Sequence, residues 1–132
     1  MNIKDGEILY RYARSNVFPE GQNELPSSIF NDSEMSCDWR KYQLSPEKSP
    51  QVISGRNMII AITVCDAIRN PTNPSREGEL VAAWAQQYLH DPVAEIEGNS
   101  FTPNESHSLI KGKKKVAVTK AIIQNSTFNI VL

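Results

Sequence analysis

The chain has 132 residues, 39% of them hydrophobic and 22% charged, and a formal net charge of -1 at pH 7. This length predicts a single domain over residues 1–132 with one hydrophobic core, and the near-neutral charge excludes a general nucleic-acid coat protein. The N-terminus is charged and no long apolar run occurs. These features exclude a secretory signal and a membrane span, so we expect a soluble, cytoplasmic protein.

Two cysteines and two histidines limit the chemistry that the chain can carry. Cys37 and Cys65 form no C-x-x-C pair, which excludes a disulfide scaffold and a cysteine zinc site. We expect both thiols to fill the core as small hydrophobic groups. His90 and His107 lack the spacing of a metal motif, so the sequence predicts no metal and no cofactor.

The first predicted element is a strand over residues 6–13, whose alternating side chains fall on two faces. Within it, Arg11 is expected either to pair with a buried carboxylate, with Asp38 as the candidate, or to bind a substrate phosphate or carboxylate. Residues 15–28 contain prolines and a glycine and predict a long loop. Long ordered loops in small domains often carry function.

The region after this loop predicts short, irregular structure. Ser27 and Ser28 precede a short strand or turn, and the pair at positions 33–34 resembles a weak helix start. Prolines in the next segment exclude a long regular element. We therefore expect a short irregular helix near residues 46–53 that ends at Gly55.

The middle of the chain predicts a strand followed by a helix. Residues 57–65, NMIIAITVC, are nearly apolar on both faces, which is typical of a central strand covered on both sides. Residues 76–88 predict a helix. Leu80, Trp84 and Tyr88 recur at intervals of four and would share one helical face.

The C-terminal part predicts a polar connection over residues 94–106, a short strand at 107–110, a helix at 113–124 and a terminal strand at 127–132. Together these elements predict an α+β fold. We expect a small mixed or antiparallel sheet with two or three short helices packed on it.

The densest charge cluster of the chain lies near the start of the third predicted helix. Five lysines occur within ten residues: Lys111, Lys113, Lys114, Lys115 and Lys120. Cations at a helix start oppose the helix dipole, so the cluster suggests an anion-binding role. The alternative is a solvated basic turn that serves only solubility.

A second candidate is the segment of residues 37–42, which contains Asp38, Trp39 and Arg40. Tryptophan and arginine together are typical of interface hot spots. The alternative is a structural clip on the sheet.

The histidines form a third candidate. His107 can serve as a general acid or base, or add a donor to an anion site. Adjacent His90 and Asp91 point to different sides of an extended chain and cannot form a triad alone, so a surface turn after a helix is favoured. No P-loop, dinucleotide or G-x-S-x-G motif occurs.

Five short islands resemble a group of small uncharacterised bacterial proteins, which carry a similar series across most of their length. The islands are L-Y-R (9–11), P-S-S-x-F (26–30), M-S-x-D-W (35–39), H-D-P (90–92) and H-S-L-I-x-G-K-K (107–114). The resemblance implies no catalytic residues, but it implies a bacterial or mobile-element source. It also implies that the islands meet in the fold, so that one site would be lined by Arg11, Ser27, Ser28, Asp38, His107 and Lys113.

The favoured function is a cytoplasmic, non-catalytic adaptor that binds an acidic partner within a bacterial assembly, such as a phage-defence system or a mobile element. A protein face is the favoured partner and a nucleic-acid backbone the alternative. The contact surface would consist of Lys111, Lys113, Lys114, Lys115, Asp38, Trp39 and Arg40. A flat, exposed surface of Trp39 and lysines would favour this function.

The second hypothesis is an enzyme that acts on a nucleotide or phosphorylated substrate. Arg11 and Lys113 would hold the anion, His107 would act as acid or base, and Ser27 or Ser28 would support it. A concave pocket that contains Arg11 and His107 would favour the enzyme. A third hypothesis is a structural subunit with an exposed apolar patch near Trp84 and the terminal strand.

Overall fold

The computed structural model describes residues 2–17, 24–76, 79–92 and 104–131. The strands are β1 (Ile8–Ala13), β2 (Glu34–Trp39), β3 (Met58–Thr63), β4 (Gln87–His90), β5 (His107–Lys111) and β6 (Ser126–Ile130). The α-helices are α1 (Pro50–Ile53), α2 (Asp66–Arg69) and α3 (Val116–Gln124). Four 3-10 helices complete this part of the chain: η1 (Ser15–Val17), η2 (Ser27–Phe30), η3 (Pro46–Lys48) and η4 (Ala82–Trp84).

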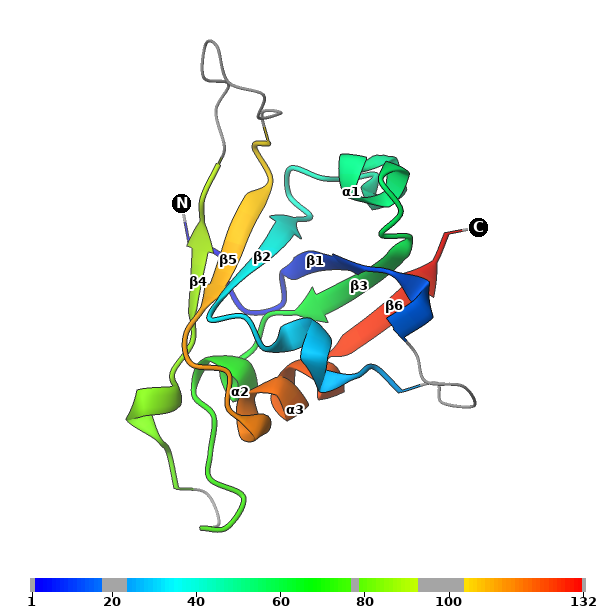
Figure 1. The fold of residues 1–132 in the computed structure, drawn as a ribbon. Helices are drawn as coiled ribbons and strands as arrows, with labels where there is room; N and C mark the ends of the chain where they lie inside the picture. Colours follow the sequence, from blue (N-terminus) through cyan, green and yellow to red (C-terminus); the bar gives the residue numbers. More distant parts are fainter. Residues whose placement is uncertain (1, 18–23, 77–78, 93–103, 132) are drawn as a thin grey trace.

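The strands form one six-stranded antiparallel sheet in the order β4-β5-β2-β1-β3-β6, which confirms the predicted α+β class (Figure 1). The terminal strand β6 pairs with β3 of the same chain. Strands β4 and β6 form the two edges of the sheet.

Alternation along the strands divides the sheet into two faces. The covered face carries fully buried side chains, among them Leu9, Met35, Ile60, Ile62 and Ile110. Helices α2, α3 and η2 supply the buried side chains that pack on this core: Ile68, Val118, Ile122, Ile29 and Phe30. The hydrophobic core of the domain therefore lies between this face and these helices.

The opposite face, which we call the polar face, carries Tyr12, Ser36, Asp38 and His107. Residues of η3 and α1 lie beside this face, and Figure 1 shows α1 on the other side of the sheet from α2 and α3. On this face Ser36 is exposed and Tyr12 and His107 are half-buried, whereas Asp38 is buried.

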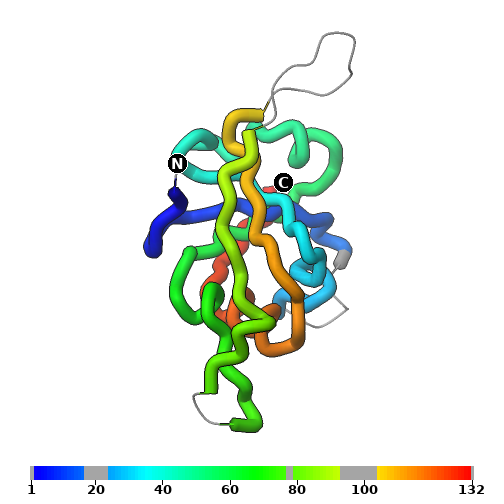
Figure 2. The backbone as a smooth tube through the Cα atoms, turned by 90° about the vertical axis from the view of Figure 1, so that its left-hand side faces the viewer, coloured from blue at the N-terminus to red at the C-terminus, as the bar shows by residue number. Residues whose placement is uncertain are grey.

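The sheet twists sharply between β2 and β1. These strands pair at only two positions, whereas β1 and β3 pair at six. Figures 1 and 2 show β4, β5 and β2 running across the direction of β1. Beyond Tyr10 and Asp38 the two strands separate, and the separation opens the polar face.

Two predicted elements are confirmed closely. The predicted strand at 57–65 is β3, which lies between β1 and β6 and buries Met58, Ile59, Ile60 and Ile62. The predicted irregular helix at 46–53 is the succession of η3 and α1, and Gly55 follows it with a φ of 112°.

The predicted helix at 76–88 is wrong. In the described part of this segment the chain forms η4 and then the edge strand β4, and Leu80 is 65% exposed. The spacing of Trp84 and Tyr88 fits a strand as well as a helix, because four is a multiple of the strand period. Pairing with β5 decides between them, and Tyr88 then lies opposite Ile110.

The expected weak helix start at positions 33–34 is also wrong, because Glu34 opens β2. The strand alternates apolar Met35, Cys37 and Trp39 with Ser36 and the buried Asp38, which is the period-two pattern of a half-covered strand. At Ser27 and Ser28 the chain forms η2, so the turn is observed rather than the strand.

Two predicted loops are only partly described. The predicted connection at 94–106 lies mostly outside the described residues, which resume at Asn104. The same holds for the centre of the predicted loop at 15–28, and its start forms η1.

Candidate functional site

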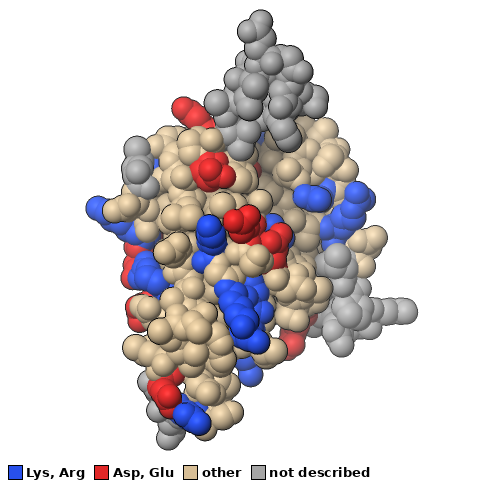
Figure 3. Space-filling view, turned by 60° about the vertical axis from the view of Figure 1, so that its left-hand side comes forward, with Lys and Arg blue, Asp and Glu red and all other residues tan. Residues whose placement is uncertain are grey.

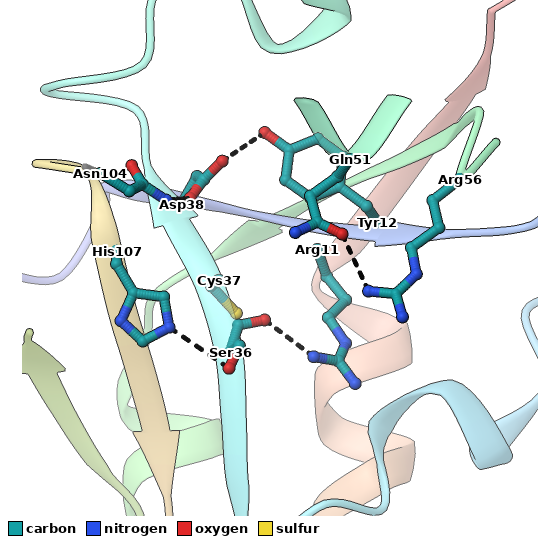
Figure 4. Close-up of a pocket in the computed structure, with 9 residues that line it drawn as sticks. All are labelled: Arg11, Tyr12, Ser36, Cys37, Asp38, Gln51, Arg56, Asn104 and His107. Atoms are coloured by element: carbon teal, nitrogen blue, oxygen red, sulfur yellow. Dashed lines mark hydrogen bonds between the residues drawn. The ribbon is translucent and has the colours of Figure 1, made fainter. Parts of the chain in front are cut away.

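A small pocket lies on the polar face where β1 and β2 separate, and we call it the splay pocket (Figure 4). Its volume is about 70 Å³. It is lined by Arg11, Tyr12, Ser36, Cys37, Asp38, Gln51, Arg56, Asn104 and His107. These residues come from β1, β2, β5, α1 and two loops, so the pocket exists only in the folded chain.

One end of the splay pocket is built around the buried carboxylate of Asp38, which is 5% exposed. The hydroxyl of Tyr12 donates to Oδ2 over 2.8 Å, and Nδ2 of Asn104 donates to Oδ1 over 2.8 Å. Burial, together with the nearby Asp38 charge, raises the pKa of Tyr12 far above its ordinary value. Tyr12 therefore stays protonated and serves as a permanent donor.

Arg11 crosses the gap between the separating strands. Its Nε donates to the carbonyl of Ile29 over 3.3 Å, and its Nη1 donates to the carbonyl of Ser36 over 2.8 Å. The expected pairing of Arg11 with Asp38 is wrong, because Tyr12 and Asn104 occupy that carboxylate. The other guanidinium N–H groups make no hydrogen bond to the described residues, so they remain available to a ligand.

His107, the register partner of Asp38, connects its neighbouring strands at the edge of the splay pocket. Its Nε2 lies 3.3 Å from Oγ of Ser36 on β2. Its Nδ1 lies 2.8 Å from the carbonyl oxygen of Asp91 and 3.2 Å from Oδ2 of the same residue, which follows β4. Figure 4 shows His107 and Arg11 approaching Ser36 from opposite sides.

The rim of the splay pocket carries a second cation. Arg56 is exposed and donates from Nη1 to Oε1 of Gln51 over 2.9 Å. Gln51 thereby holds a guanidinium on the side of the pocket that contains Arg11 (Figure 4).

Cys37 also lines the splay pocket, but it is 3% exposed and packs in the core as expected. Burial raises the pKa of its thiol to about 12. A thiol with this pKa forms almost no thiolate at neutral pH, so Cys37 is not the nucleophile of this site.

The structure brings together three of the six residues expected to meet, namely Arg11, Asp38 and His107. Ser27 and Ser28 are exposed in η2, and Lys113 is exposed in the loop between β5 and α3. None of these three lines the splay pocket.

The lysine cluster does not form one free basic patch. Nζ of Lys111 lies 3.7 Å from Oε1 of Glu34, and Nζ of Lys114 donates to the carbonyls of Ile110 and Gly112 over 2.9 Å each. Burial lowers the pKa of Lys114 to about 8. On the face drawn in Figure 3, lysines and arginines lie beside acidic residues in the part that the structure describes.

The lysines also do not open the helix as expected. Helix α3 begins at Val116, so Lys113 and Lys114 lie in the preceding loop and Lys115 takes the N-cap position without a side-chain cap. Lys113, Lys115 and Lys120 are exposed.

Trp39 is not an exposed hot spot, because it is 1% exposed and its Nε1 donates to Glu7. Its ring packs against Tyr42 and His90, whose rings are stacked with centroids 5.0 Å apart. Arg40 beside it is exposed. Trp39 therefore packs within the fold, and His90 ends a strand rather than a helix.

Sequence reasoning missed several residues of the splay pocket: Tyr12, Ser36, Gln51, Arg56 and Asn104. It also missed the contact of Asp91 with His107. The alternation in M-S-C-D-W carries a signal for two of the site residues, since it places Ser36 and Asp38 on one face of a strand. No comparable sequence pattern marks Arg56 and Asn104, which the loops contribute to the pocket.

No family model, no curated protein and no solved structure matches this chain. The resemblance to small bacterial proteins thus depends on its short islands alone. No helix in the described ranges is long and apolar enough to cross a membrane, and the same residues contain no cluster of three potential metal ligands among His, Cys, Asp and Glu.

Proposed function

We propose that the chain is a small enzyme that acts on a substrate carrying a phosphate group, and that the splay pocket binds this group. The observation that carries the proposal is the position of Ser36 between the guanidinium of Arg11 and the imidazole of His107. An arginine offers fixed N–H donors for phosphate oxygens, and a histidine exchanges protons with a reacting group. A concave pocket that contains Arg11 and His107 is the feature expected to favour an enzyme, and the splay pocket contains both residues.

The distribution of charge supports an anionic ligand at the Ser36 end of the pocket. Arg11 and Arg56 lie on one side of it (Figure 4). The acidic lining residue, Asp38, has both carboxylate oxygens occupied by hydrogen-bond donors at the opposite end. The two ends therefore differ in charge, and the cationic end contains the accessible hydroxyl of Ser36.

The size of the pocket limits what it can enclose. Pockets that enclose drug-sized ligands measure about 300–1,000 Å³, whereas this one measures about 70 Å³. A phosphate group suits a space of this size better than a whole nucleotide does. The rest of the substrate would lie outside, against the polar face.

Titration with inorganic phosphate, followed by two-dimensional amide NMR, tests this proposal. We expect chemical-shift changes centred on Ser36 and His107. Arg56→Gln removes one exposed cation and should weaken binding about 3–10-fold. Arg76→Gln is the matched control, because Arg76 is an exposed arginine with a side chain 71% accessible that does not line the pocket. Shifts that spread over all cationic surfaces, or no shifts near Ser36, would contradict the proposal.

A second candidate is the adaptor that binds an acidic partner, with a protein face favoured over a nucleic-acid backbone. The observation that favours it is the exposure of Lys113, Lys115 and Lys120, none of which makes an ion pair with another described residue. Arg40 would contribute at the far end of β2, while the buried Asp38 and Trp39 would not. A cytoplasmic location and a bacterial assembly belong to this candidate as proposals.

A further inference from the structure

We propose that Ser36 is a nucleophile that accepts the phosphoryl group, with His107 as its general base and Asp91 as the residue that positions His107. The inference rests on the proposed phosphorylated substrate but adds the reaction type and two residues. A nucleophile, a base within hydrogen-bond reach of it and a third group that orients the base form the general arrangement of an activated serine.

The hydrogen bonds of His107 determine which nitrogen can act as the base. Nδ1 faces two acceptors of Asp91, the carbonyl oxygen at 2.8 Å and Oδ2 at 3.2 Å. Two acceptors at one nitrogen require the proton to reside there, so Nδ1 donates. The lone pair of Nε2 then points to the hydroxyl of Ser36, 3.3 Å away.

The backbone fixes these three residues relative to one another. Ser36 on β2 lies opposite Leu109 on β5, next to the register pair of Asp38 and His107. Asp91 is held at the end of β4 because its amide donates to the carbonyl of His107 over 2.8 Å. Two adjacent strands therefore supply the nucleophile and the base, and the residue that follows a third strand supplies the orienting group.

Access and charge at Ser36 also fit a nucleophile. Ser36 is exposed, and the side chain of His107 is 22% accessible. Arg11 donates to the backbone carbonyl of Ser36, so a guanidinium lies next to the residue whose hydroxyl would be phosphorylated. In phosphoryl transfer, catalysis comes mainly from positioning and from cations that stabilise the charge on the phosphoryl oxygens.

The reaction balances with water as the only co-reactant. Oγ of Ser36 forms a bond to phosphorus while the bond from phosphorus to the alcohol oxygen breaks. The hydroxyl proton moves to Nε2 of His107 and then to the leaving oxygen. Water next gives a proton to Nε2 and bonds to phosphorus, the bond from phosphorus to Oγ breaks, and Oγ takes the proton back. The products are an alcohol and phosphate.

Labelling with a fluorophosphonate probe tests the nucleophile directly, because an activated serine forms a bond to its phosphorus and releases fluoride. We expect one adduct per chain, mapped to Ser36 by peptide mass spectrometry. Ser36→Ala should abolish it, and His107→Gln should slow it about 100-fold or more. Ser33→Ala is the matched control, because Ser33 is an exposed serine just before the same strand.

The positioning role of Asp91 has its own readout. Its side chain is 57% accessible, so Asp91→Asn should leave the thermal midpoint unchanged while it slows labelling about tenfold. Asp91→Glu should restore part of the rate, because the carboxylate is retained. Equal labelling rates in all three proteins would remove Asp91 from the mechanism.

The outcomes separate this inference from the proposed function. A folded chain in which Ser36 is unlabelled, or labelled no faster than Ser33, overturns the inference even if phosphate binds. Labelling of Ser36 without phosphate binding supports the nucleophile and contradicts the proposed substrate class. Turnover of p-nitrophenyl phosphate by the wild type but not by Ser36→Ala is expected. Turnover of p-nitrophenyl acetate alone would overturn the phosphoryl step.

Discussion

At the scale of single residues, Arg11 connects the fold to the candidate site. It donates to the carbonyl of Ser36 on β2, beyond the last register pair of β1 and β2, and to the carbonyl of Ile29 in η2. An arginine has five N–H donors in a rigid fork, so it can satisfy backbone carbonyls and still offer donors to a ligand. The same side chain therefore closes the gap in the sheet and places a cation beside Ser36.

Tyr12 donates a hydrogen bond to the buried carboxylate of Asp38. The change Tyr12→Phe removes the donor to Oδ2 of Asp38 and leaves a buried carboxylate oxygen unsatisfied. We expect the free energy of unfolding to fall by about 1–3 kcal/mol, measured by urea denaturation at neutral pH. Tyr10→Phe is the control, because Tyr10 lies on the same face and is also half-buried. Equal losses in both variants would contradict the structural role of this hydrogen bond.

The burial of Tyr12 beside Asp38 gives the stability a defined alkaline dependence. Burial raises the pKa of Tyr12 above the value of about 10 that a tyrosine has in an unfolded chain. The folded state then holds the phenol proton more tightly, so this stabilisation is complete below pH 10 and is lost as the pH rises above it. Wild type should lose more stability than Tyr12→Phe between pH 8 and pH 11.

At the scale of elements, the turn after β5 is shaped by a close approach of two segments. Gly112 has a φ of 152°, and a Cβ there would lie 2.6 Å from Nε2 of Gln86 and 2.7 Å from the carbonyl oxygen of Ala85. The amide of Gln86 lies in this space because it donates to the carbonyls of Trp84 and Lys113. The path of the chain into α3 thus requires glycine at position 112, where a side chain would collide with Gln86 and Ala85.

Gly112→Ala should therefore destabilise the protein by about 2 kcal/mol or more, since neither the backbone nor the buried amide can move freely. Gly6→Ala is the matched control, because Gly6 has a φ of 91° and no heavy atom within 4 Å of an added Cβ. Gly6→Ala therefore measures the cost of the backbone strain alone, and the additional loss in Gly112→Ala measures the cost of the close approach. Thermal unfolding of both variants measures the difference, and a smaller loss for Gly112→Ala than for Gly6→Ala would contradict this packing.

The sequence predicts those helices and strands whose own pattern of apolar side chains determines their secondary structure. The strand β3 is almost wholly apolar, and both β3 and α3 are predicted from their own residues, although the apolar side chains of α3 buried in the core are Val118 and Ile122. The edge strand β4 was not found, because its four residues depend on β5 for their hydrogen bonds. The spacing of Trp84 and Tyr88 fits either period, and only the pairing partner decides between them.

At the scale of the whole molecule, the candidate site follows from the way the sheet twists. Strands β4, β5 and β2 cross the direction of β1, β3 and β6, and the polar side chains of both groups meet at the separation (Figures 1 and 2). Arg11, Asp38 and His107 could be named as candidates from their chemistry. The alternation along β2 places Ser36 on one face with Asp38, but the relevance of Ser36 and Arg56 depends on a gap between strands that no local pattern encodes.

The charge of the whole molecule also defines a test of the adaptor function. The net charge is -1, so attraction to a nucleic acid depends on local cations. Lys111 is paired with Glu34 and Lys114 is bound to backbone carbonyls, which leaves Lys113, Lys115 and Lys120 of this cluster.

Three phosphate contacts predict a slope of about -2.7 in a plot of log affinity against log salt concentration for duplex DNA, and Lys113→Gln should reduce its magnitude by about 0.9. Fluorescence anisotropy over a series of salt concentrations measures both values, with Lys48→Gln as an exposed control outside the cluster. A slope of about -4.5, as five free lysines would give, would mean that the ion pair of Lys111 and the carbonyl contacts of Lys114 open on binding. A slope near zero would exclude nucleic acid and leave an acidic protein face as the partner of the adaptor.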